Sequence, residues 1–156
     1  MVHIHLADQL NLEVGAGRID LKKLQRAAQV TLEYLHPQDE VDCSIVITDD
    51  PGIQEYNQQY RKIDRPTDVL SFPSDTVDPD SDRLYLGDVI ISYQRAEAQA
   101  QSGNHPLDAE LQLLVVHGVL HLSGHDHAVE EERARMTNAQ SEILASLDVD
   151  ISPPQM

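Results

Sequence analysis

The segment from Leu107 to Ser123 constrains the fold of this chain most, because it is long enough for a helix and apolar along one face. Pro106 stands immediately before it, where a helix commonly begins. The apolar residues at helical spacing are Leu107, Leu111, Leu114, Val115, Val119 and Leu122. Since such a face needs apolar partners, we expect this helix to pack centrally, against a sheet or neighbouring helices.

The C-terminal end of this predicted helix carries histidines, in the sequence HGVLHLSGHDH. His117 and His121 are four positions apart, so their side chains share a face, about 6 Å apart along a helix axis. Gly124 can adopt the left-handed conformation that ends a helix, and the chain would then return His127 as a third ligand. Three imidazoles with water in a fourth position are typical of catalytic zinc, which lowers the pKa of that water to about 7. The sequence therefore predicts one zinc ion per chain, with another divalent transition metal as the alternative.

These histidines have two other interpretations. One is a histidine-rich helix end that binds no metal. The other is a protease, because the same histidine spacing occurs in metzincins, where a glutamate after the first histidine is the general base. Gly118 occupies that position here, so peptide hydrolysis is the weaker interpretation.

Strand-like and amphipathic segments alternate along the rest of the chain. Strands are expected at 3–6, 41–48, 69–72 and 84–92, and further helices at 20–35, 50–61, 93–101 and 128–147, with a polar loop at 75–83. This order predicts an α+β fold in one metallohydrolase-like domain over residues 1–150, followed by a frayed tail at 151–156. A mixed sheet of about four strands would be covered by about five helices, with the zinc site at the C-terminal end of the central one.

Composition narrows the classes of protein further. The 156 residues are 40% hydrophobic, enough for one core, and Cys43 is the single cysteine, so no disulfide within the chain is possible and we expect Cys43 to pack. The start has no basic leader and no apolar run reaches about 18 residues, which predicts a cytoplasmic protein without a membrane segment. A net charge of −16 opposes nonspecific attraction to nucleic acid, so any RNA site must be local. His3 and His5 are expected to face outward.

Three stretches together resemble one protein family: NQQYRKIDRPTDVLSFP at 57–73, LGDVIIS at 86–92 and HGVLHLSGHDH at 117–127. They are similar to the YbeY family of bacterial rRNA maturation factors. The resemblance implies a zinc-dependent endoribonuclease that prefers single strands, matures the 3′ end of 16S rRNA and acts in ribosome quality control. The partners it implies are single-stranded rRNA, the small ribosomal subunit and basic ribosomal proteins or assembly factors.

The resemblance also assigns roles to individual residues. His117, His121 and His127 match the family's metal ligands, and Arg61 matches its arginine associated with RNA cleavage. Physically, a guanidinium can bind a phosphate through two hydrogen bonds and stabilise charge in the transition state. The alternative for Arg61 is a structural role at a helix end, with the last carbonyls or with Asp64 as its partner.

For six further residues the sequence leaves the role open between shaping the site and contacting substrate or a metal ligand. The family's TDVLSF segment contributes Thr67, Asp68, Ser71 and Phe72, which either shape the wall of the cleft or contact substrate. His125 stands where many relatives have tyrosine, so it is not a required ligand, although it can contact RNA or tune the metal. Asp126 either accepts the free N–H of a ligand histidine or caps its own loop.

The nucleophile and the overall function each leave alternatives. Metal-activated hydroxide could cut RNA or DNA, whereas attack by the RNA 2′-hydroxyl would leave a 2′,3′-cyclic phosphate and spare DNA. A non-catalytic ribosome-assembly factor with a structural zinc is one rival, which the negative charge favours because such a protein would reach rRNA through basic protein partners. A metallohydrolase acting on peptides or small molecules is the other, distinguished by whether Arg61 and Arg65 line the same cleft as the histidines.

Overall fold

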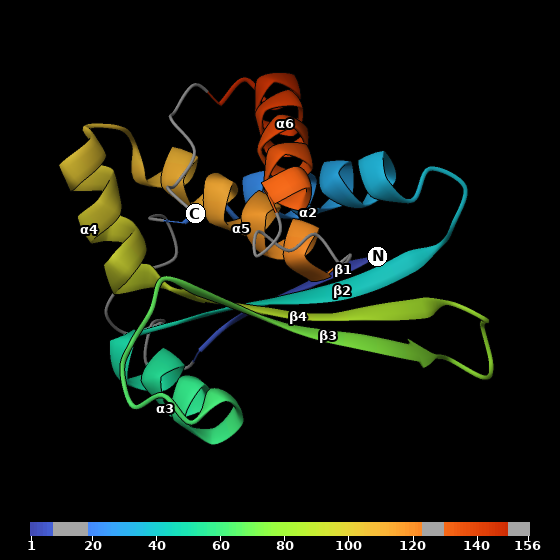
Figure 1. The fold of residues 1–156 in the computed structure, drawn as a ribbon, viewed down its shortest axis with the longest axis horizontal. Helices are drawn as coiled ribbons and strands as arrows, with labels where there is room; N and C mark the ends of the chain where they lie inside the picture. Colours follow the sequence, from blue (N-terminus) through green and yellow to red (C-terminus); the bar gives the residue numbers. More distant parts are fainter. Residues whose placement is uncertain (8–18, 123–129, 150–156) are drawn as a thin grey trace.

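A computed structural model describes residues 1–7, 19–122 and 130–149 of the chain (Figure 1). Within these residues four strands and five helices follow one another. They are β1 (Val2–Leu6), α2 (Leu21–Leu35), β2 (Val41–Thr48), α3 (Asp50–Arg61), β3 (Val69–Val77), β4 (Leu84–Ser92), α4 (Tyr93–Gly103), α5 (Leu107–Leu122) and α6 (Glu130–Ser146). The predicted α+β class is confirmed, while the predicted tail at 151–156 lies outside the described residues.

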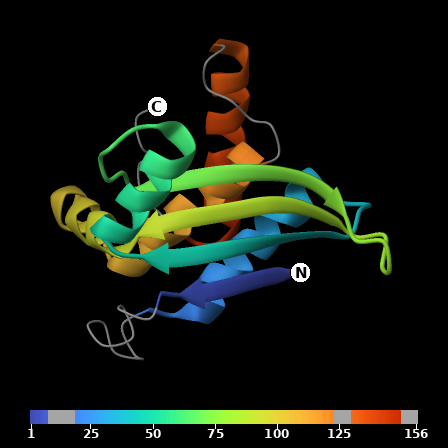
Figure 2. The same cartoon turned by 90° about the horizontal axis from the view of Figure 1, so that it is seen from below.

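The four strands form one mixed sheet in the order β1-β2-β4-β3, seen side by side in Figure 2. The strands β1, β2 and β4 are parallel, and β3 joins the far side of β4 in the antiparallel direction. Both β1 and β3 are therefore edge strands. Along β2 alternate residues from Val41 to Ile47 are buried, as expected for a strand with one face on the main core.

Helices cover the two faces of the sheet unequally (Figure 1). The main core lies between one face and α2, α4, α5 and α6, and a small core of Ile53, Leu70 and Ile90 lies under α3 on the other face. Helix α5 contacts α2, α4, α6, β3 and β4, which explains why every residue from Leu111 to Leu120 is buried. A helix enclosed in this way is apolar around most of its circumference.

Local sequence signals account for where the helices begin. The Asp20 carboxylate accepts from the backbone N–H groups of Lys22 and Lys23 at the start of α2, and Ser92 accepts from the N–H of Arg95 at the start of α4. At α3 the Asp49 carboxylate accepts from Gly52 N at 2.8 Å, with proline in the first turn. The predicted helix starts at these three places are correct to within one residue.

The strand predicted at 69–72 is longer in the structure, and the loop predicted at 75–83 is correspondingly shorter. β3 continues to Val77, with an irregular register between Pro73 and Thr76. Proline is tolerated because β3 is an edge strand, where one side of the backbone needs no ladder hydrogen bond. Opposite Pro73, Gly87 has φ +135°, and a side chain there would collide with the carbonyl oxygen of Phe72.

Two smaller predictions, for the β1 histidines and for Cys43, are also confirmed. His3 and His5 are exposed on β1. Cys43 is fully buried in β2, and this burial raises the pKa of its thiol to about 12, so it is a packing residue. The described residues contain no helix that is both long and apolar enough to span a membrane.

Candidate functional site

Two of the three predicted metal ligands lie together at the C-terminal end of α5. The Nε2 atoms of His117 and His121 are 3.2 Å apart, and their ring centroids are 4.7 Å apart in an edge-on arrangement. Two imidazole nitrogens bound to one tetrahedral zinc at about 2.0–2.1 Å would be about 3.3 Å apart. The pair therefore has the spacing of two ligands of a single ion, which is also the spacing of a hydrogen bond between the two rings. His127, the predicted third ligand, lies outside the described residues, as do His125 and Asp126.

Gln140, on α6, holds one of these histidines in place. Its Oε1 lies 3.0 Å from His117 Nδ1, and its side chain is fully buried. An amide oxygen can only accept, so the Nδ1 atom of His117 carries the proton and its Nε2 presents a lone pair. Among the described residues the Nε2 atom of Gln140 has no hydrogen-bond partner. No sequence pattern indicated Gln140, and Asp126 was the residue predicted for such a role.

Gly118 is required where α5 crosses the sheet. A Cβ atom at this position would come within 2.5 Å of Val89 Cγ1, and the Gly118 carbonyl accepts a hydrogen bond of 2.9 Å from Ser71 Oγ. The position that holds the general base in metzincins therefore points into packed side chains. A glutamate could not project from it toward a metal, which removes the basis for a protease of that kind.

The TDVLSF segment connects β3 to its surroundings. Ser71 fastens the strand to α5, as described above. The Asp68 carboxylate accepts from Val69 N at 2.8 Å and from Gln99 Nε2 at 3.3 Å, and its carbonyl accepts from Ser92 N at 2.9 Å. These contacts hold the start of β3 against α5, α4 and β4, while Thr67 lines the hollow described next.

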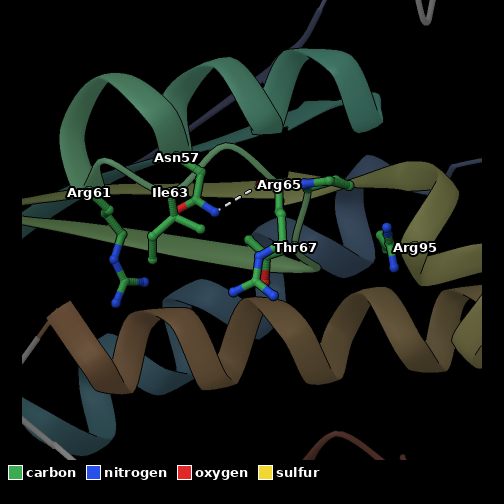
Figure 3. Close-up of a pocket in the computed structure, with 7 residues that line it drawn as sticks. Asn57, Arg61, Ile63, Arg65, Thr67 and Arg95 are labelled. Carbon is green, nitrogen blue, oxygen red and sulfur yellow. Dashed lines mark hydrogen bonds between the residues drawn. The ribbon is translucent and has the colours of Figure 1, made fainter.

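Three arginines line one hollow of about 390 Å³ beside the end of α3 (Figure 3). Its lining consists of Asn57, Arg61, Ile63, Arg65, Pro66, Thr67 and Arg95, with no acidic side chain among them. Asn57 Nδ2 donates to the carbonyl of Arg65 at 2.9 Å, which holds the loop after α3 against the helix. Arg95 lies 3.4 Å from the Asp50 carboxylate. The hollow is cationic in a chain whose net charge is −16.

The structural alternative for Arg61 named two partners, the last carbonyls of α3 and Asp64. The carbonyls of Asn57 and Gln58 in the last turns of α3 accept from the backbone N–H groups of Lys62 and Ile63. Asp64 accepts from Gln54 Nε2 at 2.9 Å, and in the part of the chain that the structure describes it forms no ion pair with Arg61. Arg61 is exposed and its guanidinium is available to a ligand in the hollow.

The hollow and the histidines lie near the same edge of the sheet. α5 is fastened to edge strand β3, and the loop after α3 leads directly into that strand (Figure 2). In the view of Figure 3 the Arg61 side chain extends from α3 toward α5. Arg61 and Arg65 share one hollow, but neither described histidine belongs to its lining. The predicted sign of a phosphate site, arginines and histidines in one cleft, is therefore not seen among the described residues.

These features are those of a hydrolase-type domain, with candidate metal ligands at a helix end and a cationic hollow beside it. The chain matches the family model for Endoribonuclease YbeY over residues 10–148, and it belongs to that family. The resemblance seen in the sequence is thereby confirmed.

Individual relatives and one solved structure agree with this assignment. Endoribonuclease YbeY of Pelotomaculum thermopropionicum is 46% identical over 129 residues, which cover 81% of this chain and 85% of the relative. The protein of the same name from Persephonella marina is 42% identical over 139 residues, covering 88% and 90%. The solution structure of TM1509 from Thermotoga maritima is 26% identical over the full length of both chains, with a TM-score of 0.57.

Proposed function

We propose that this protein is a zinc-dependent endoribonuclease that cuts single-stranded RNA, matures the 3′ end of 16S rRNA and acts in ribosome quality control in the cytoplasm. The observation that carries the proposal is the pair of Nε2 atoms 3.2 Å apart at the end of α5, close to a hollow lined by three arginines. The name shared by the relatives supports RNA as the substrate.

His117, His121 and His127 are the residues that would hold the zinc ion. Bound zinc would supply a Lewis acid for a phosphoryl oxygen and lower the pKa of water. Gln140 fixes the ring orientation of His117, so that its unprotonated nitrogen would be available to bind the ion. The donor set of neutral imidazoles suits zinc and retains the full charge of the cation.

Arg61 would bind the scissile phosphate. Its guanidinium can donate two parallel hydrogen bonds to phosphate oxygens and stabilise the charge that develops on them. Arg65 and Arg95 would bind neighbouring phosphates of the same strand. Because Gly118 excludes a carboxylate from the metzincin position, the attacking group is either water or the 2′-hydroxyl of the RNA. The second route leaves a 2′,3′-cyclic phosphate and spares DNA.

The test measures zinc content and RNA cleavage together in the wild type, His117→Ala and Arg61→Glu at matched folding. We expect His117→Ala to lose both zinc and cleavage, and Arg61→Glu to keep zinc while losing cleavage of a single-stranded rRNA 3′-end substrate. If the wild type binds zinc but cuts no more RNA than the variant with both changes, the nuclease proposal is wrong and the activity is a contaminant's.

The net charge of −16 favours a second candidate, a ribosome-assembly factor in which the zinc is structural. Such a protein would reach rRNA on the small subunit through basic ribosomal proteins or assembly factors, because its own surface repels a polyanion. A wild type that binds zinc and associates with small subunits without cutting RNA would support this function. No comparable observation favours peptides or small molecules as substrates.

A further inference from the structure

Tyr60, in the last turn of α3, is the most exposed aromatic residue among the large hydrophobic side chains of the described chain. Two thirds of its surface (66%) is accessible to solvent. Two other rings support it: Tyr56 lies 6.4 Å away at an interplanar angle of 19°, and Phe72 of β3 lies 5.2 Å away at 55°. Tyr56 and Phe72 are themselves 6.3 Å apart, so the three rings form one cluster. Tyr60 is thus held by aromatic neighbours while much of its ring faces solvent.

This cluster and the arginine hollow both include side chains from the last turns of α3. Residues four apart lie in one row along a helix, and α3 therefore carries a row of Tyr56 and Tyr60 beside a row of Asn57 and Arg61. The second row belongs to the lining of the hollow. The exposed ring of Tyr60 and one arginine of the hollow, Arg61, are consequently at consecutive positions at the end of α3.

A structural explanation of Tyr60 accounts for only part of these observations. Contact with Phe72 covers one side of the Tyr60 ring and shields the small core under α3. It gives no reason for a large aromatic ring whose remaining surface faces water, one position before Arg61 of the hollow. Exposed aromatic rings beside cationic grooves are the combination that binds single-stranded nucleic acid, through base stacking and phosphate contacts respectively.

We propose that Tyr60 is a stacking platform for one nucleobase of single-stranded RNA whose phosphates lie in the hollow of Arg61, Arg65 and Arg95. This inference rests on the proposed function, because it takes RNA as the ligand. Tyr56 and Phe72 act as positioning residues that hold the ring of Tyr60. Stacking requires an unpaired base, so the platform accounts for a preference for single strands over duplexes.

The test measures affinity for a fluorescein-labelled uridine octamer by fluorescence anisotropy, at several salt concentrations, with the full chain. Tyr60→Leu keeps an apolar side chain but removes the ring, and we expect it to weaken binding about 5- to 100-fold. Tyr60→Phe keeps the ring and should bind like the wild type. Tyr34→Leu is the matched control, because Tyr34 is 48% exposed on α2, which covers the other face of the sheet.

Salt dependence separates stacking from charge. Tyr60→Leu should leave the slope of log affinity against log salt unchanged, whereas Arg61→Glu should make it shallower by about one phosphate contact or more. A second probe is the same octamer made entirely of abasic nucleotides, to which Tyr60→Leu and the wild type should bind equally. The chain contains no tryptophan, so quenching of tyrosine emission by bound RNA, reduced in Tyr60→Leu, gives an independent signal.

The outcomes distinguish this inference from the proposed function. If Arg61→Glu weakens binding while Tyr60→Leu matches Tyr34→Leu and the wild type, RNA binds in the hollow and the platform is wrong. If Tyr60→Leu weakens binding to the abasic octamer as much as to the normal one, the effect is not stacking and the platform is again wrong. A wild type with no affinity for the octamer at low salt overturns both proposals.

Discussion

Gln140 gives the sharpest test of whether the end of α5 is a metal site. Replacement by methionine keeps the length and volume of the side chain but removes the oxygen that lies 3.0 Å from His117 Nδ1. His117 would then lose this acceptor, and its proton could shift to Nε2, where the metal must bind. Loss of such an orienting partner typically lowers metal affinity 10- to 100-fold, which is about 1.4–2.8 kcal/mol.

The same change should affect folding much less than a buried hydrogen bond normally would. Removing one partner of such a bond costs about 1–3 kcal/mol when a buried group is left unsatisfied. Here methionine takes this acceptor away from the His117 Nδ1–H, but it also removes the Gln140 Nε2 donor, which has no partner among the described residues, so the two effects oppose each other. We therefore expect zinc affinity to fall while the free energy of unfolding of the metal-free protein changes by less than about 1 kcal/mol.

Zinc affinity is measured by competition with a chromophoric chelator, and unfolding by urea titration of the metal-free protein. Gln140→Glu restores an acceptor and should keep wild-type affinity or exceed it. Gln112→Met is the control. Gln112 is buried too, but it lies on α5 and donates to the Asp108 carbonyl at 3.1 Å instead of contacting a histidine. Equal zinc affinity in Gln140→Met, Gln112→Met and the wild type would refute the role given to Gln140.

Three further predictions concern the stability and packing of the fold. Gly118→Ala should lower the free energy of unfolding by about 1–3 kcal/mol, because its Cβ would meet Val89 Cγ1 at 2.5 Å; a thermal melt at or above that of the wild type would contradict this. Arg83 hydrogen bonds lower the pKa of Asp42 from 3.8 to about 2, so the stability they confer is complete above pH 4 and lost as the pH falls toward 2. Asp42→Asn should flatten the decline in melting temperature over that range, and parallel declines would rule this out. Buried Cys43 should react with a thiol reagent only at the rate of unfolding, whereas rapid stoichiometric labelling of the native protein would show that it is accessible.

Most of the fold could be predicted because the strongest local signals and the tertiary structure agree. The apolar periodicity of α5 and the capping residues Asp20 and Ser92 place helices where the structure has them. The end of β3 could not be predicted in the same way. Pro73 and the polar residues after it are typical of a loop, and only the position of β3 at the sheet edge allows the strand to continue.

The candidate site likewise has a part that local sequence patterns predict and a part that they do not. His117 and His121 are four positions apart in one helix, so their spacing is sufficient to predict that their side chains are in contact. Gln140 is 23 positions from His117 on another helix, and nothing in the sequence distinguishes it from the other glutamines of the chain. The hollow likewise depends on Arg95, which reaches it from α4 and is remote from Arg61 in sequence. The places of Gln140 and Arg95 depend on contacts between helices, which local sequence patterns do not predict.

Strand β3 determines how the two halves of the site are placed relative to each other. Successive side chains of a strand point to opposite faces, and here Ser71 donates to Gly118 of α5 on one face while Phe72 contacts Tyr60 of α3 on the other. An interior strand would have neighbours on both sides and would separate helices on its two faces. As an edge strand, β3 leaves a border where the end of α5 and the loop after α3 can approach one substrate. Its register, with Ser71 opposite Val89 of β4, therefore fixes the histidines and the arginine hollow together, and a slip of one residue would exchange these two contacts between the faces.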